Sequence, residues 1–146
     1  MGGQRVDEAA LGRLGGEFAR SLRPPPPVVV AIAGDLGTGK TTLVRAIARA
    51  LGVTEPVTSP TFALVHRYAG RAVSVYHVDA YRLRRAADAA DLGLDDMLGE
   101  PDSVVLIEWP ERLGEALPPP THRIKLAYTD DPLIRQLEVS HSTLHS

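Results

Sequence analysis

The segment GDLGTGKT (residues 34–41) decides the fold of this 146-residue chain, because it matches the phosphate-loop pattern G-x-x-x-x-G-K-[ST]. Glycines let a backbone wrap closely enough for its N–H groups to point at phosphate oxygens. A helix that begins directly after such a loop adds the positive end of its dipole. The segment therefore predicts a loop that binds the phosphates of a nucleotide.

The residues on either side of this loop supply the context that the pattern requires. Residues 28–33 (VVVAIA) are continuously apolar and mostly β-branched, which is typical of a strand buried on both faces of a parallel sheet. Residues 41–51 repeat leucine and isoleucine at helical spacing and end before Gly52, a residue that favours the end of a helix. The order strand, loop, helix predicts a P-loop NTPase.

The rest of the chain alternates helical and strand patterns without a long linker or an internal repeat. We expect α/β architecture: a single-domain P-loop NTPase over residues 1–140, whose mixed, largely parallel central sheet is flanked by helices and contains antiparallel hairpins. We expect residues 141–146 to form a flexible tail. The patterns predict helices at 7–22 and 111–117, a proline spacer at 24–27, a partly helical stretch from 82 to 97, a strand at 103–107, and hairpins from 62–68 with 72–79 and 123–128 with 133–139.

Composition excludes several classes of protein. The chain has no cysteine, so a disulfide framework and thiolate metal sites are excluded. Its apolar runs are far shorter than the roughly 20 residues that span a bilayer, and its start lacks an apolar signal region, so we expect a cytoplasmic protein that does not enter a membrane. The net charge of −2 does not favour a polyanion, so we expect any contact with RNA to run through partner proteins.

Three polar residues at the end of the loop have predicted roles in binding ATP and Mg²⁺. The Lys40 ammonium would reach the terminal phosphates, the Thr41 hydroxyl would coordinate Mg²⁺, and Thr42 could donate near the inner phosphates. The residues predicted to bind ATP are Asp35, Leu36, Gly37, Thr38, Gly39, Lys40, Thr41 and Thr42.

A phosphate site of this kind also needs a carboxylate at the end of a neighbouring buried strand. Glu108 follows the apolar run 103–107, so we expect it to hold the metal. Asp79 ends a second candidate strand, and His77 lies two residues before it, so both side chains project to one face. Either could position water or the metal, but for His77 we favour a hydrogen bond to Asp79 within the sheet.

Three other features have both a functional and a structural interpretation. Residues 58–62 (TSPTF) carry three hydroxyls where nucleotide switches sense the terminal phosphate through Mg²⁺, although a proline-bearing turn would look the same. Trp109, the single tryptophan, could serve packing or contact a ligand or partner. His141 and His145 have the spacing of a metal pair, but we expect them to lie in the flexible tail.

The pattern alone leaves several functions open. An N/T-K-x-D element, which reads guanine in GTPases, does not occur, so guanine specificity is unsupported. A small-molecule kinase of the P-loop class remains an alternative, although the chain leaves little length for a lid and an acceptor pocket. A nucleotide-sensing module that binds ATP without hydrolysing it is a third possibility.

Four blocks together carry a more specific resemblance. They are residues 34–42 (GDLGTGKTT), 58–62 (TSPTF), 77–83 (HVDAYRL) and 106–112 (LIEWPER). In this order and spacing the chain resembles the bacterial tRNA threonylcarbamoyladenosine biosynthesis family TsaE, also called the YjeE family. One departure is Leu11, which stands where relatives often have threonine and which puts adenine contacts at that position in doubt.

The resemblance implies a P-loop ATPase that supports turnover of the TsaB–TsaD threonylcarbamoyl transferase and meets tRNA only indirectly, through that complex. It implies ATP hydrolysis that is weak in the isolated chain, because no arginine is placed by a motif as a finger and a partner could complete the site. By motif match, Lys40, Asp79 and Glu108 would be catalytic, and Thr41 and Glu108 would bind Mg²⁺. The residues sensitive to the switch or to a partner would be Thr61, Tyr81, Arg82 and Trp109.

Overall fold

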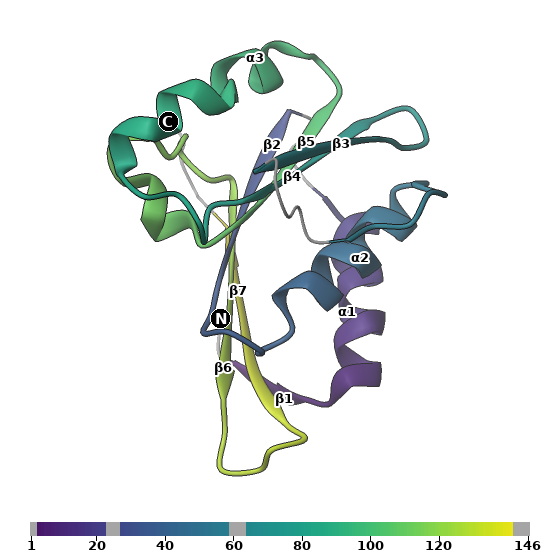
Figure 1. The fold of residues 1–146 in the computed structure, drawn as a ribbon. Helices are drawn as coiled ribbons and strands as arrows, with labels where there is room; N and C mark the ends of the chain where they lie inside the picture. Colours follow the sequence, from purple (N-terminus) through teal and green to yellow (C-terminus); the bar gives the residue numbers. More distant parts are fainter. Residues whose placement is uncertain (1–2, 23–26, 59–63, 142–146) are drawn as a thin grey trace.

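The fold is described from a computed structural model, which covers residues 3–22, 27–58 and 64–141 (Figure 1). Within these residues the strands form one mixed sheet of seven. They are β1 (Gln4–Val6), β2 (Val28–Ala33), β3 (Val65–Ala69), β4 (Ser74–Asp79), β5 (Ser103–Glu108), β6 (His122–Tyr128) and β7 (Arg135–His141). Their order across the sheet is β1-β7-β6-β2-β5-β4-β3.

The centre of the sheet is parallel, as the sequence predicts. β2 pairs in parallel with β5 on one side and with β6 on the other, and β5 pairs in parallel with β4. All six residues of β5 are buried, and so are the first five of β2, which explains why residues 28–33 and 104–107 are continuously apolar rather than alternating. The carboxyl ends of β2, β5 and β4 therefore lie next to one another at the same end of the sheet.

Helices cover both faces of this sheet (Figure 1). On one face α1 (Glu8–Arg20) and α2 (Lys40–Ala50) pack against each other and over Val30, Ile32 and Leu106. On the other face lie the 3₁₀ helix η1 (Ala86–Leu92), α3 (Leu94–Gly99) and the 3₁₀ helix η2 (Pro110–Ala116), with a second core that includes Val78 and Ile107. The predicted fold class, a single α/β domain with a mixed central sheet, is confirmed.

Both predicted hairpins are present as antiparallel pairs, β3 with β4 and β6 with β7. The prediction missed β1, which pairs antiparallel with β7 through Gln4 and Leu137, because three residues are too few to show an alternating pattern. Asp7 caps the start of α1, since its Oδ1 atom accepts from the backbone N–H of Ala10 at 2.8 Å.

The C-terminal boundary differs from the prediction. His141, the first residue of the predicted tail, continues β7 and is paired with His122, so the strand extends one residue into the segment predicted to be flexible. Backbone pairing with β6 extends β7 beyond the point where its apolar pattern ends. Residues 142–146, with His145, lie outside the described residues, as do residues 24–26 of the proline spacer. None of the helices in the described ranges is long and apolar enough to cross a membrane.

Candidate functional site

The loop between β2 and α2 has the backbone that its glycines predict. Gly34 adopts φ +156°, and a Cβ atom there would lie 2.6 Å from the carbonyl oxygen of Leu126. Gly39 adopts φ +106° directly before α2, and a Cβ atom there would lie 2.8 Å from the side chain of Leu11. Because other residues rarely adopt these angles and would clash, both pattern glycines are required by the path of the loop.

The Lys40 side chain is folded back into this loop. It is 5% exposed, and its Nζ atom donates to the carbonyl oxygens of Gly34 at 2.5 Å and Asp35 at 2.9 Å. The same atom lies 4.2 Å from the ring centroid of Trp109, a cation–π contact. Burial lowers the pKa of Lys40, and the negative charge of Glu108 offsets part of that effect.

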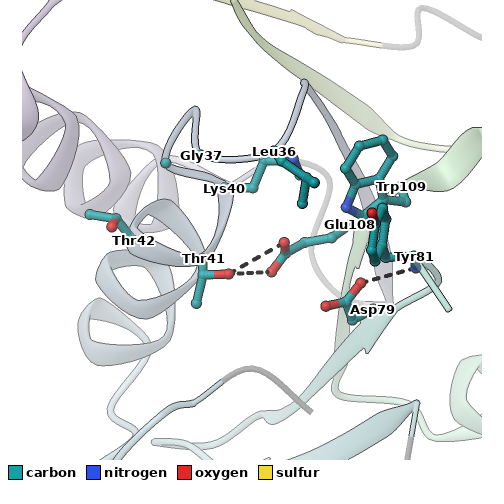
Figure 2. Close-up of a pocket in the computed structure, with 10 residues that line it drawn as sticks. Leu36, Gly37, Lys40, Thr41, Thr42, Asp79, Tyr81, Glu108 and Trp109 are labelled. Carbon is teal, nitrogen blue, oxygen red and sulfur yellow. Dashed lines mark hydrogen bonds between the residues drawn. The ribbon is translucent and has the colours of Figure 1, made fainter. Parts of the chain in front are cut away.

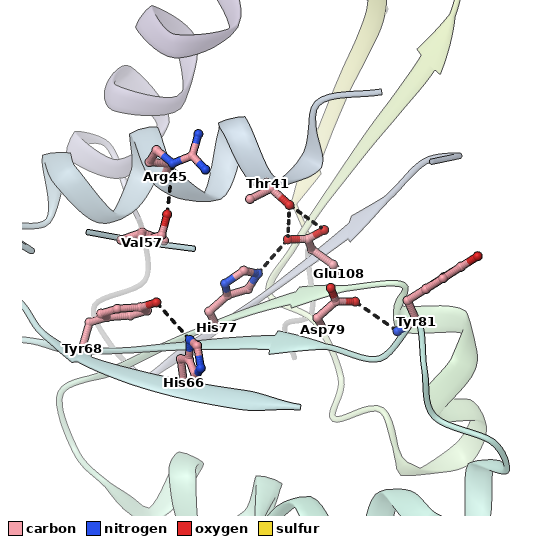
Figure 3. Close-up of polar contacts among 9 residues, drawn as sticks. All are labelled: Thr41, Arg45, Val57, His66, Tyr68, His77, Asp79, Tyr81 and Glu108. Carbon is pink, nitrogen blue, oxygen red and sulfur yellow. Dashed lines mark hydrogen bonds and ion pairs between the residues drawn. The ribbon is translucent and has the colours of Figure 1, made fainter. Parts of the chain in front are cut away.

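A second polar contact joins α2 to the sheet (Figure 3). Thr41 Oγ1 donates to Glu108 Oε2 at 3.1 Å, and His77 Nε2 lies 2.6 Å from the same oxygen. The prediction that His77 bonds to Asp79 was wrong. Residues two apart on one strand project side by side, whereas the ring of His77 reaches across the β4–β5 ladder to the neighbouring strand.

Asp79 and Glu108 end neighbouring strands and are paired in the parallel register of β4 and β5. Asp79 Oδ1 accepts from the backbone N–H of Tyr81 at 3.0 Å. Burial raises the pKa of Asp79, and the nearby charge of Glu108 raises it further. The two predicted carboxylates therefore lie together at the end of the sheet, in different hydrogen-bonding environments.

These groups surround a cavity of about 340 Å³ (Figure 2). The cavity unites residues predicted separately from the loop, from both carboxylates and from the two aromatic positions. Its lining residues are Leu36, Gly37, Gly39, Lys40, Thr41, Thr42, Asp79, Tyr81, Glu108 and Trp109.

The remaining predicted residues are placed differently. Asp35 is exposed, and its carbonyl oxygen accepts from Lys40 and from the Thr38 hydroxyl. Arg82 is exposed and does not line the cavity. Thr61 lies outside the described residues, so the structure gives no placement for it.

Trp109 closes one side of the cavity. It adopts φ +60°, and its backbone N–H donates to the carbonyl oxygen of Ile32 at 3.3 Å. Its ring lies 4.9 Å from the ring of Tyr81, and the Arg112 guanidinium lies 5.2 Å from Tyr81 and 5.8 Å from Trp109. Its ring faces the cavity and Lys40 and also packs against the second core, so both features predicted for Trp109, packing and a place at a ligand site, are present.

A second cavity of about 250 Å³ lies on the α1 side of the loop. Sequence reasoning missed its wall from the β6–β7 connection, because those residues carry no motif and reach the loop only through the pairing of β6 with β2. The lining residues are Asp7, Glu8, Leu11, Gly37, Thr38, Gly39, Thr42, Pro132, Leu133 and Arg135.

The residues at the first cavity fit a magnesium ion bound with a nucleotide. Mg²⁺ prefers oxygen ligands and is commonly held by one or two protein groups together with phosphates and water. The Thr41 hydroxyl and the Glu108 carboxylate already lie 3.1 Å apart at the cavity wall. Within residues 3–22, 27–58 and 64–141, no three or more His, Asp or Glu side chains are grouped as a metal cage.

Comparison with known proteins gives consistent matches. The family model described as "Threonylcarbamoyl adenosine biosynthesis protein TsaE" matches residues 6–137, which include the loop and both carboxylates. Among proteins named tRNA threonylcarbamoyladenosine biosynthesis protein TsaE, that of Haemophilus influenzae is 36% identical over 128 residues, covering 86% of this chain and 80% of its own length. That of Streptomyces coelicolor is 42% identical over 119 residues, covering 80% and 78%. A crystal structure of Bacillus subtilis YdiB matches with a TM-score of 0.75 at 29% identity, covering 92% of this chain and 81% of that one.

Proposed function

The chain belongs to the TsaE family, and from this premise we propose that it is an ATP hydrolase that serves the synthesis of threonylcarbamoyladenosine in tRNA. The observation that carries the proposal is the convergence of Lys40, Thr41, Asp79 and Glu108 on one cavity next to a glycine loop. Loop amides, a lysine, a hydroxyl and two carboxylates are the groups that phosphoryl transfer to water requires.

Lys40 and the loop would bind the phosphates of ATP. Its Nζ atom now donates to two carbonyl oxygens of the loop, and phosphate oxygens would replace these neutral acceptors with charged ones. Burial lowers the pKa of Lys40, and the negative charge of phosphates opposes this effect and keeps the ammonium protonated. Lys40 would then stabilise the charge that develops on the terminal phosphate.

Thr41 and Glu108 are the residues that would hold Mg²⁺. When bound, the metal would neutralise phosphate charge and help to position the transferred group. The chain's own contribution is to keep the two oxygen ligands in place. Glu108 is oriented from one side by Thr41 on α2 and from the other by His77 on β4.

Asp79 is the candidate group for positioning the attacking water. Its carboxylate lines the cavity, and one oxygen is fixed by the backbone N–H of Tyr81. Burial raises the pKa of Asp79, which makes it a better proton acceptor than an exposed aspartate. Its neighbour Glu108 already holds hydrogen bonds from Thr41 and His77, so the two carboxylates are suited to different tasks.

The second cavity is the place for the nucleoside half of ATP. It shares Gly37, Gly39 and Thr42 with the first cavity, so a ligand could occupy both across the loop. Leu11 and Leu133 offer apolar surface against which a flat base could pack. Leu11, which stands where relatives often have threonine, would therefore contact the base through apolar packing.

We propose TsaB and TsaD as the partners, and the cytoplasm as the place of action. The family membership supports both, and the net charge of −2 fits a chain that meets tRNA through other proteins. Hydrolysis by the isolated chain should be slow, because no arginine is among the described residues that line the first cavity, next to the terminal phosphate, where it could stabilise the transition state.

The test is phosphate release from Mg·ATP, measured for the purified chain alone and with TsaB and TsaD added. We expect slow release alone and stimulation by the pair. Lys40→Ala should abolish release, whereas Lys125→Ala, at the other lysine of the chain and exposed on β6, should leave it unchanged. Glu108→Ala should weaken Mg²⁺-dependent binding more than Asp130→Ala, which removes an exposed carboxylate.

The alternatives give different results in the same assay. A nucleotide sensor would bind ATP and release no phosphate in either condition. A small-molecule kinase would transfer the phosphate to a small acceptor and would not respond to TsaB and TsaD. Unchanged release by Lys40→Ala would contradict the proposed site.

A further inference from the structure

The end of β4 and the turn after it supply two groups to the first cavity, the carboxylate of Asp79 and the ring of Tyr81. The proposed role of Asp79 requires its carboxylate to keep one direction, because a displacement of about 1 Å can cost about 100-fold in rate. One oxygen of this carboxylate accepts from the backbone N–H of Tyr81 at 3.0 Å. The direction of the carboxylate therefore depends on where the backbone of Tyr81 lies.

Arg112, on η2, holds the Tyr81 backbone from its other side. Its Nη1 atom donates to the carbonyl oxygen of Tyr81 at 2.9 Å, although the two residues are 31 positions apart in the chain. The backbone N–H of Arg112 donates to the carbonyl oxygen of Trp109 at 3.0 Å, which ties the arginine to the segment that follows β5. Arg112 thus joins the segments that follow the two strands ending in Asp79 and Glu108.

The Arg112 guanidinium also packs against the two aromatic rings of the cavity wall. It lies 5.2 Å from the ring of Tyr81 and 5.8 Å from that of Trp109. Figure 2 shows these two rings next to each other on one side of the cavity. A guanidinium can stack on an aromatic ring and still donate hydrogen bonds in its own plane. Arg112 is exposed and does not line the cavity, so it reaches the site only through these neighbours.

We propose that Arg112 is a positioning residue for ATP hydrolysis, which holds the backbone of Tyr81 and thereby the carboxylate of Asp79. The inference rests on the proposed hydrolase function and adds to it a residue outside the cavity. Without the guanidinium, the carbonyl oxygen of Tyr81 loses its donor and the turn after β4 can move. The water aligned by Asp79 is then misplaced, whereas the phosphate loop and Lys40 are not disturbed.

The test measures kcat and KM of Mg·ATP hydrolysis for Arg112→Met and the unaltered chain, each alone and with TsaB and TsaD. Methionine keeps an unbranched side chain but has neither the charge nor the N–H donors. We expect kcat to fall by about tenfold or more at unchanged KM, because misplacing a catalytic group slows the reaction without weakening binding of the substrate. Arg112→Lys, which can donate to the Tyr81 carbonyl, should recover part of kcat. Arg84→Met is the matched control, because it removes another exposed arginine from the segment after Tyr81.

Quenching of tryptophan fluorescence by acrylamide gives a second readout, which needs no hydrolysis. Trp109 is the only tryptophan of the chain, so its signal reports on the cavity wall next to Arg112. We expect quenching to increase in Arg112→Met and to return towards the unaltered value in Arg112→Lys. Thermal melting gives the temperature below which all variants are folded, and both measurements are made below it.

The outcomes separate the inference from the proposed function. Equal kcat for Arg112→Met and the unaltered chain would overturn the inference and leave the hydrolase in place. A higher KM at unchanged kcat would assign Arg112 to nucleotide binding, and a lower kcat without increased quenching would show that the wall does not move; either would overturn it. An equal loss of kcat in Arg84→Met would attribute the effect to surface charge, which also contradicts it. If the unaltered chain released no phosphate in either condition, the proposed function itself would fail.

Discussion

The Nε2 atom of His77 lies 2.6 Å from Oε2 of Glu108, at a position where the histidine is 0% exposed. The same carboxylate oxygen accepts from Thr41 Oγ1 at 3.1 Å. One side chain of β5 is thus held between β4 and the first turn of α2. The distance between these atoms is that of a hydrogen bond, in which a proton on Nε2 is donated to the carboxylate.

The first prediction concerns this contact. His77→Leu should lower the affinity for Mg²⁺ in the presence of ATP by about tenfold. Removing a group that orients a metal-binding carboxylate typically costs about 10- to 100-fold in metal affinity. His77→Gln, which can donate to Glu108, should recover part of that loss. The measurement is a Mg²⁺ titration of ATP binding. His66→Leu is the control, since His66 contacts Tyr68 and lines neither cavity (Figure 3). Equal behaviour of His77→Leu and His66→Leu would contradict the prediction.

The second prediction concerns the stability cost of Asp79. Burial raises the pKa of Asp79 above its ordinary 3.8, so the ionised carboxylate destabilises the fold at neutral pH. Asp79→Asn should therefore raise the melting temperature at pH 7, by about 1–3 °C, while impairing hydrolysis. The gain should vanish below about pH 3.8, where the carboxyl of the unaltered chain is protonated in both folded and unfolded states. Melting curves across this pH range test it, and a gain that did not change with pH would exclude the charge as its cause.

The third prediction concerns Glu100, which joins α3 to the β3–β4 hairpin. Its carboxylate accepts from Arg67 Nη2 at 2.8 Å, from Ser74 Oγ at 2.5 Å and from the hydroxyl of Tyr76. These hydrogen bonds, with that of Arg67 contributing most, lower the pKa of Glu100 from 4.5 to about 2. The stabilisation is therefore complete above pH 4.5 and is lost as the pH falls towards 2.

Glu100→Gln should accordingly lower the free energy of unfolding at pH 7, and the difference from the unaltered chain should shrink between pH 4.5 and pH 2. Urea titrations at several pH values measure it. Glu115→Gln, at an exposed glutamate of η2, serves as the control. A Glu100→Gln effect that remained constant down to pH 2 would show that the ionised carboxylate is not its source.

The fourth prediction tests the packing of α1 on α2. A Cβ atom on Gly15 would lie 2.9 Å from Cβ of Ala46 and 3.1 Å from Cδ1 of Leu43, whereas one on Gly12 would meet nothing within 4 Å. Gly15→Val should therefore destabilise the fold by about 1–3 kcal/mol, the usual cost of overpacking. Gly12→Ala in the same helix should stabilise it by about 0.5–1 kcal/mol through helix propensity. Urea unfolding separates the two, and a neutral Gly15→Val would mean that the helices can move apart freely.

Much of the site could be predicted because its signals are local. The positive φ angles of Gly34 and Gly39 are required wherever such a loop precedes a helix, so a sequence pattern is enough to predict them. Glu108 was found because it follows the apolar run of a buried strand, and Asp79 because it ends a second segment with a strand pattern. The alternation along 72–79 also placed His77 and Asp79 on one side of the sheet.

Other parts could not be predicted, because they depend on which strands are neighbours. The partner of His77 follows from the parallel register of β4 and β5, which brings Glu108 within its reach. Arg135 reaches the phosphate loop only because β6 pairs with β2, and β1 exists only because β7 offers it an edge. The spacing of residues along the chain does not predict any of these strand pairings.

By itself, the sequence determined a strand, a phosphate-binding loop and a helix in that order, the parallel centre of the sheet, and the residues that end its strands. Only the tertiary structure decided which of those residues contact one another: Lys40 with Trp109, Thr41 and His77 with Glu108. The physical reason is that backbone conformation and burial patterns depend on neighbouring residues, whereas contacts between distant side chains depend on strand order and register. That order is fixed by the joint packing of both faces of the sheet, to which residues from the whole chain contribute.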